Sequence, residues 1–109
     1  MSAAEELARR DARFRHRCFC DDHGWTGDCH GLGYIPLSGA ALLLACAEWC
    51  KDSRYYVREL GWNSKNSWVC RLLKEGGDPR LHGHVAEKKD TAPEAAAAAV
   101  LAAMGKEGA

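Results

Sequence analysis

The sequence lacks the segments that place a chain in a membrane or mark it for export. None of its apolar runs approaches the roughly 20 residues that a membrane-spanning helix needs. The first ten residues, MSAAEELARR, contain none of the apolar stretch that a signal peptide requires. We therefore expect no membrane contact and a chain that stays in the cytoplasm in which it is made.

Net charge is also absent. Fifteen Lys and Arg residues balance fifteen Asp and Glu residues, which removes the argument from bulk charge for a general affinity for nucleic acids. The length of 109 residues suits one domain with a single hydrophobic core. In a reducing cytoplasm, the six cysteines are expected to be free thiols or metal ligands rather than disulfides.

The basic residues are concentrated near the N-terminus, where nine consecutive residues contain five arginines and a single acidic residue. Ser2 and Glu5 form a capping box, which predicts a basic helix in residues 1–17, from Ala3 to about His16. It is either a solvated helix that leans on the domain through a narrow contact, or an arm that binds phosphate or an acidic protein surface through its guanidinium groups. The arginines are Arg9, Arg10, Arg13, Arg15 and Arg17.

The next segment, residues 18–37, begins with a dense group of possible metal ligands. Five Cys and His residues lie close together among four glycines that let a loop double back. A structural zinc site needs four thiolate or imidazole ligands, so the segment predicts a Cys/His-rich loop that binds zinc, although Cys-x-Cys is not the usual Cys-x-x-Cys spacing. The alternative is an irregular loop with incidental thiols, anchored by Trp25 and Tyr34. The candidate ligands are Cys18, Cys20, His23 and Cys29, with His30 as a substitute.

These cysteines have no catalytic motif around them. A zinc deaminase requires a glutamate beside the first ligand and a later Pro-Cys-x-x-Cys motif, and the sequence contains neither. A nucleophilic pair of Cys29 with a distant histidine stays open, but no recognisable oxyanion site or orienting carboxylate accompanies it. We therefore expect a protein that is not an enzyme and assign no catalytic residue.

Residues 38–105 predict an α+β domain that begins with a helix. Ser38 caps this helix, which has a broad apolar face and runs to about Lys51. Cys46 and Cys50 lie one turn apart on that face. Their neighbours are apolar, so we expect them to pack in the core rather than to bind a metal.

Three strands and a second helix complete the predicted domain. Apolar and polar residues alternate in residues 55–60, 67–73 and 81–87, which predicts a three-stranded antiparallel sheet covered by the two helices. Thr91 and Glu94 form a capping box for an alanine-rich helix. A short tail is expected over residues 106–109.

The stretch Leu81 to Met104, LHGHVAEKKDTAPEAAAAAVLAAM, places a strand with histidines before a polar turn, Asp-Thr-Ala-Pro and an alanine-rich helix. In this it resembles the phage ABA sandwich domain family of small phage and prophage proteins. The resemblance covers about residues 38–104 and is strongest over His84 to Leu101. It implies the α-β-β-β-α fold and a phage source, and it brings no catalytic residue with it.

The aromatic residues indicate how such a protein acts. Four tryptophans and three tyrosines are more than so small a core readily hides, and exposed aromatic residues beside arginines commonly anchor protein interfaces. Trp25, Tyr34 and Trp62 therefore join the five arginines as expected partner-binding residues. With the resemblance, this predicts a non-enzymatic phage accessory protein that binds and inhibits a host protein, such as an anti-CRISPR or other anti-defence inhibitor.

Two other functions stay open. The order helix, three strands, helix also matches the double-stranded-RNA-binding domain, which would use the arginines with Lys65, Lys88 and Lys89. The last helix, however, has no cation before Lys106. A structural phage protein that acts as a homo-oligomer would use the same aromatic residues for self-association.

Overall fold

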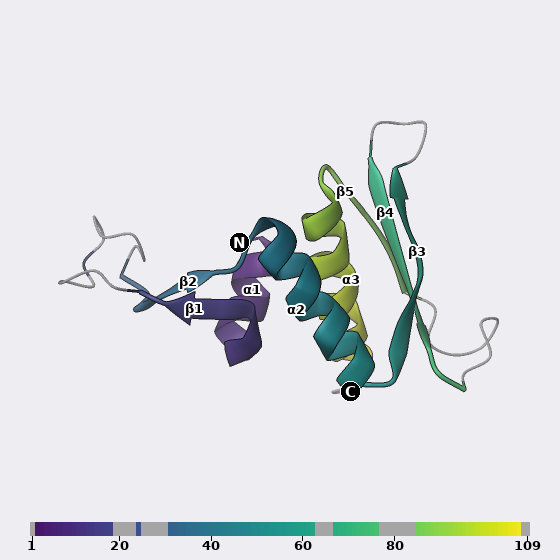
Figure 1. Cartoon of the computed structure of the whole chain (residues 1–109), viewed down its shortest axis with the longest axis horizontal. Helices are drawn as coiled ribbons and strands as arrows, with labels where there is room; N and C mark the ends of the chain where they lie inside the picture. The colour runs from purple at the N-terminus through teal and green to yellow at the C-terminus, as the bar shows by residue number, and fades with distance from the viewer. Residues whose placement is uncertain (1, 19–23, 25–30, 63–66, 77–84, 108–109) are drawn as a thin grey trace.

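The computed structural model describes residues 2–18, 24, 31–62, 67–76 and 85–107 (Figure 1). Helices pack beside antiparallel strands, so the α+β class expected from the sequence is confirmed. Along the chain the elements are α1 (Ala3–Arg10), a 3-10 turn (Ala12–Phe14), β1 (Arg15–Arg17), β2 (Tyr34–Pro36), α2 (Gly39–Asp52), β3 (Tyr55–Trp62), β4 (Trp68–Lys74), β5 (Val85–Lys89) and α3 (Ala92–Glu107).

The larger sheet is antiparallel, with its strands in the order β3-β4-β5, while β1 and β2 form a separate two-stranded ribbon. The central strand β4 is buried on both faces. Cys70 and Leu72 face the helices and belong to the main core, and Val69 and Leu73 alternate with them on the opposite face. Of the two outer strands, β3 is the longer, with eight residues.

A β-bulge changes the direction of side chains along β3. The register of β3 against β4 shifts between Val57 and Glu59, so Arg58 is an extra residue in β3. Because of this extra residue, Val57 and Leu60 lie on the same face of the sheet, the one that faces the helices.

Helix α3 lies at the centre of the molecule, between α1 and the sheet, with α2 alongside it (Figure 1). Its six consecutive residues Ala95 to Val100 are all buried, so the helix is covered around its whole circumference. Because an alanine side chain ends at Cβ, neighbouring elements can approach the helix backbone closely. The start of α3 is as predicted: the Glu94 N–H donates a hydrogen bond to Thr91 Oγ1 at 3.3 Å.

The N-terminal segment is not the single helix expected over residues 3–16. α1 begins after Ser2, whose Oγ accepts a hydrogen bond from the Glu5 N–H at 3.2 Å, and it ends one residue before Asp11. The backbone of Asp11 is extended, and its Oδ1 accepts a hydrogen bond from the Arg13 N–H at 2.9 Å, which starts the 3-10 turn. The Asp11 side chain thus binds a backbone N–H that would otherwise be part of the helix, and α1 ends there.

This turn leads the chain into the core. Leu7, Ala8 and Phe14 are fully buried, and Leu7 and Phe14 belong to the same core cluster as α2 and α3. The Leu37 N–H donates a hydrogen bond to the Phe14 carbonyl at 2.9 Å, beside the β1–β2 ribbon. The N-terminal segment therefore packs on the domain through these side chains and is part of its core.

Other boundaries differ less. Strand β2 lies within residues 18–37, for which the sequence predicts a loop. Helix α3 continues to Glu107, so the first two residues of the tail expected over residues 106–109 are helical instead. The third strand, expected over residues 81–87, is β5 from Val85 onward, and residues 81–84 lie outside the described residues.

Ala99 tests how closely α3 is packed, because it is fully buried. We expect Ala99→Leu to lower the free energy of unfolding by about 1 to 3 kcal/mol, since a larger side chain must push α3 away from its neighbours. Ala41→Leu, at an exposed position of α2, is the matched control and should change stability by less than about 0.5 kcal/mol. Urea unfolding measures both variants. Equal effects would show that α3 is not closely packed.

Candidate functional site

The structure bears on part of the predicted zinc site. Cys18 is described, and its side chain is buried directly after β1. Among the described residues, no group of three or more His, Cys, Asp or Glu side chains could hold a metal ion. The zinc site therefore stays a prediction. The remaining candidate ligands, together with Trp25, lie outside the described part of the chain; they are Cys20, His23, Cys29 and His30.

The first two arginines of the basic segment bind a carboxylate of their own helix. Glu6 accepts a hydrogen bond from Arg10 Nε at 2.8 Å and forms an ion pair with Arg9. The hydrogen bonds from Arg9 and then Arg10 lower the pKa of Glu6 to about 2. These pairs span three and four residues on the surface of α1, so they add little to stability but do neutralise much of the local positive charge.

The next two arginines also have partners within the chain. Arg13 Nη1 lies 3.1 Å from a carboxylate oxygen of Asp52 in α2. Arg15 Nη1 donates a hydrogen bond to the Ala8 carbonyl at 3.2 Å, and its guanidinium carbon lies 4.9 Å from the centre of the Tyr34 ring. These arginines therefore connect the N-terminal segment to the rest of the domain.

The predicted partner-binding residues do not share one surface. Tyr34 and the arginines, including the exposed Arg17, lie on α1 and the β1–β2 side, whereas Trp62 ends β3 on the far side of α2 and α3 (Figure 1). Trp62 pairs with Trp68 of β4, on the face of the sheet toward the helices, and is 62% exposed. Among the described members of the predicted set, it is the one beside the apolar cleft between α2 and β3.

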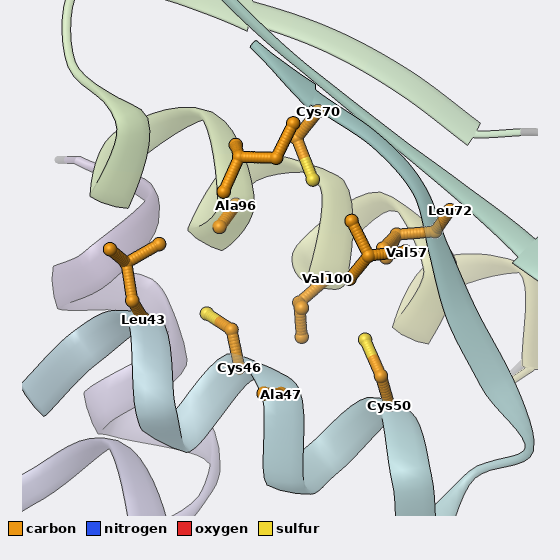
Figure 2. A pocket seen from close by; sticks show the side chains of 10 residues that line it. Leu43, Cys46, Ala47, Cys50, Val57, Cys70, Leu72, Ala96 and Val100 are labelled. Atoms are coloured by element: carbon orange, nitrogen blue, oxygen red, sulfur yellow. The ribbon is translucent and has the colours of Figure 1, made fainter. Parts of the chain in front are cut away.

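This cleft has a volume of about 180 Å³ and lies between the helices and the sheet (Figure 2). Strand β4 and helix α3 form part of its wall. The walls are almost entirely carbon and sulfur, so the cleft offers van der Waals contact and almost no hydrogen-bonding groups. The residues from α2 and β3 that line it are Leu43, Cys46, Ala47, Cys50, Val57 and Leu60.

Three thiols point into the cleft, from Cys46 and Cys50 of α2 and Cys70 of β4 (Figure 2). Burial raises the pKa of Cys46 to about 12 and the pKa values of Cys50 and Cys70 to about 11. The thiols are therefore protonated at neutral pH, and the thiol form is neither the nucleophile nor the metal ligand. The prediction that Cys46 and Cys50 pack in the core is confirmed.

Exposed apolar side chains continue the cleft to the molecular surface. Val57 and Leu60 are 46% and 40% exposed although they face the helices, and Leu44 of α2 is 63% exposed. In the part of the chain that the structure describes, β3 pairs with β4 alone, so its other edge has no strand beside it. The α2–β3 surface comprises this edge with Leu44, Ala47, Val57, Leu60 and Trp62.

An unpaired strand edge beside an apolar cleft is suited to binding a polypeptide. The edge supplies hydrogen bonds to a backbone, and the cleft receives side chains from one face of the added strand. The sequence points to Trp62 but not to Val57 or Leu60, because regular alternation would place these two on opposite faces. The signal that marks the bulge is the Val-Arg-Glu-Leu pattern, in which two charged residues stand together between apolar ones.

Comparisons of this chain with protein-family models, with curated proteins and with solved structures give no match. Within the described ranges, no helix combines the length and the apolar character needed to cross a membrane. We therefore infer the function from the geometry of the α2–β3 surface.

The cleft thiols should make the protein less stable at alkaline pH. Unfolding returns them to a pKa near 9, whereas in the folded protein they stay protonated to about pH 11. The unfolded state therefore binds fewer protons in this window, and the free energy of unfolding falls as the pH rises, by up to about 1.4 kcal/mol per pH unit for each thiol.

Urea unfolding across this pH window measures the slope. A variant with all three thiols removed, Cys46→Ala with Cys50→Ala and Cys70→Ala, should lose stability less steeply with pH, whatever its stability at neutral pH. The same slope in both proteins would show that the thiols are not buried as described.

Proposed function

We propose that this chain is a non-enzymatic protein that acts by binding another polypeptide at the α2–β3 surface. The observation that supports this most strongly is the exposure of Val57, Leu60 and Trp62 on one face of an edge strand. Burying apolar side chains is the main favourable contribution to association between proteins, and an edge strand adds backbone hydrogen bonds to it. Trp62 is the side chain most typical of an interface anchor.

The class of partner comes from the resemblance to the phage family rather than from this surface. A phage or prophage accessory protein would bind and inhibit a host protein, and a defence component such as a CRISPR effector is the target that we propose. Binding alone is sufficient for such inhibition. The function therefore needs no catalytic group.

Two observations argue against the alternatives. Arg9, Arg10, Arg13 and Arg15 contact groups of the same chain, so fewer cations are available for the phosphate contacts of a nucleic-acid-binding module. The described thiols that line the cleft are held in the protonated form, which does not favour nucleophilic catalysis there.

Photo-crosslinking in the bacterial host tests the proposal. We expect benzoylphenylalanine in place of Trp62 to give a discrete adduct with a host protein, distinct from any adduct between two copies of the chain, because this position lies at the proposed binding surface. Benzoylphenylalanine in place of Leu32, which is 51% exposed beside β2, is the matched control and should give none. Mass spectrometry identifies the adduct.

A second substitution tests whether the adduct at position 62 requires the apolar surface. Leu60→Asp, added to the protein that carries the probe at position 62, should abolish the adduct because it puts a charge on the apolar surface. Its circular dichroism spectrum should be unchanged, since Leu60 is partly exposed. Equal yields at positions 62 and 32, or an adduct insensitive to Leu60→Asp, would refute binding at this surface.

A further inference from the structure

Strand β3 has a symmetry that its bulge creates. The side chains of Tyr55, Tyr56 and Val57 point alternately to the two faces of the sheet. Residues Leu60, Gly61 and Trp62 alternate in the same way. Between these two halves stand Arg58 and Glu59, with Arg58 as the extra residue. The pattern of faces therefore reads the same from either end, with helix-side residues at positions 55, 57, 60 and 62.

This symmetry decides which pairings of β3 with itself are possible. In an antiparallel pair, residues directly opposite each other must lie on the same face of the sheet. A regular strand cannot pair with its own copy about a point midway between two residues, because the opposed residues would then lie on opposite faces. The bulge removes this obstacle in β3, where the midpoint lies between Arg58 and Glu59.

We propose that the α2–β3 surface binds a second copy of this chain, with the two β3 strands antiparallel about a two-fold axis between Arg58 and Glu59. In this register Arg58 lies opposite Glu59 of the second copy, and the reverse pair forms on the other side of the axis. The two strand edges thus join the two three-stranded sheets into one continuous sheet. This interface is isologous, as a closed dimer requires.

The charges at the centre of β3 favour a second copy of the chain over an arbitrary strand at this edge. An edge that avoids pairing usually carries charge of one sign or a proline. β3 instead carries one cation and one anion at its centre. In this register each lies opposite a charge of the other sign, whereas the two neighbouring registers place Arg58 opposite Arg58 or Glu59 opposite Glu59. Glu59 also forms an ion pair with Arg71 Nε of β4 at 2.8 Å, so Arg58 of the second copy would add a second cation to an existing pair. Opposite charges on directly opposed residues stabilise an antiparallel pair, and like charges destabilise it.

The uncharged residues fit the same register. Val57 lies opposite Leu60 of the second copy on the helix side, so the exposed parts of the two clefts cover each other. Tyr56 lies opposite Gly61 on the other face, a pairing in which an aromatic ring covers the backbone of a strand glycine. On α2, Ala40, Leu44 and Ala47 form an exposed stripe beside the cleft, and its two alanines permit close approach to the α2 of the second copy.

This inference rests on the proposed function, since it names an occupant of the same surface. A host target would then either bind the dimer or displace the second copy. The two ideas fail separately: a chain that is a monomer yet crosslinks to another protein through position 62 retains the proposed function and loses the dimer.

Sedimentation equilibrium of two charge variants tests the register directly. The wild-type protein should have twice the 11.9 kDa mass of one chain at high concentration and dissociate on dilution. Arg58→Glu should be a monomer, because four carboxylates would then meet at the two-fold axis. Glu59→Arg should be a monomer because four guanidinium groups would meet there, beside the Arg71 guanidinium groups that lose their ion pairs with Glu59. An equimolar mixture of the two variants should form a heterodimer, since each acidic pair then faces a basic pair.

The controls separate this result from unfolding or general charge effects. Arg17→Glu makes the same change of charge on the exposed end of β1 and should leave the wild-type dimer intact. Circular dichroism should show that both β3 variants are folded, which the heterodimer also demonstrates. A wild-type monomer at every concentration, or two variants that fail to associate when mixed, would overturn the proposal.

Discussion

The close packing of α3 is the interaction on which the rest of the structure depends. Its alanine side chains from Ala95 to Ala99 are buried against α1, α2 and the sheet at once. A helix of larger residues would hold these elements further apart. Because alanine contributes little apolar area of its own, the larger core side chains come from the neighbours, including Leu7, Phe14 and Leu72.

The position of α3 also explains why part of the helix-side face of β3 is exposed among the described residues. α3 packs on β4 and β5, and α2 packs on α3 and approaches β3 near the connection between them (Figure 1). Towards the other end of β3, the helix-side residues Leu60 and Trp62 stay exposed. The bulge at Arg58 adds to this by turning both Val57 and Leu60 toward the helices. The cleft is thus a consequence of where two helices cover three strands.

Local signals in the sequence identified much of the fold. Thr91 and Ser2 start helices because a hydroxyl oxygen there accepts a backbone N–H, and this requires no knowledge of the rest of the chain. The alternation in residues 55–60 and 67–73 predicted β3 and β4 for a similar reason. The end of α1 was missed because the Asp11 side chain accepts a hydrogen bond from a backbone N–H that would otherwise continue the helix. The spacing of apolar residues does not reveal this bond.

The candidate site was harder to predict because it depends on distant segments. Trp62 was expected to bind a partner from its type and place, and the structure gives it an open surface. The arginines were expected to do the same, but Glu6, Asp52 and Tyr34 contact four of the five within the chain. Such contacts arise from the tertiary fold, as does the convergence of Cys46, Cys50 and Cys70 in one cleft. The composition of the sequence and the spacing of its residues do not indicate these contacts or this convergence.

Amide hydrogen exchange at several protein concentrations tests most directly whether the free edge of β3 is an association surface. The account predicts that exchange in residues 55–62 slows as the concentration rises, since pairing protects amides that point away from β4, while exchange in α1 stays the same. Exchange in residues 55–62 that is independent of concentration, and also unchanged in an extract of the host, would contradict it. In that case the open edge of β3 would be a passive feature of the fold.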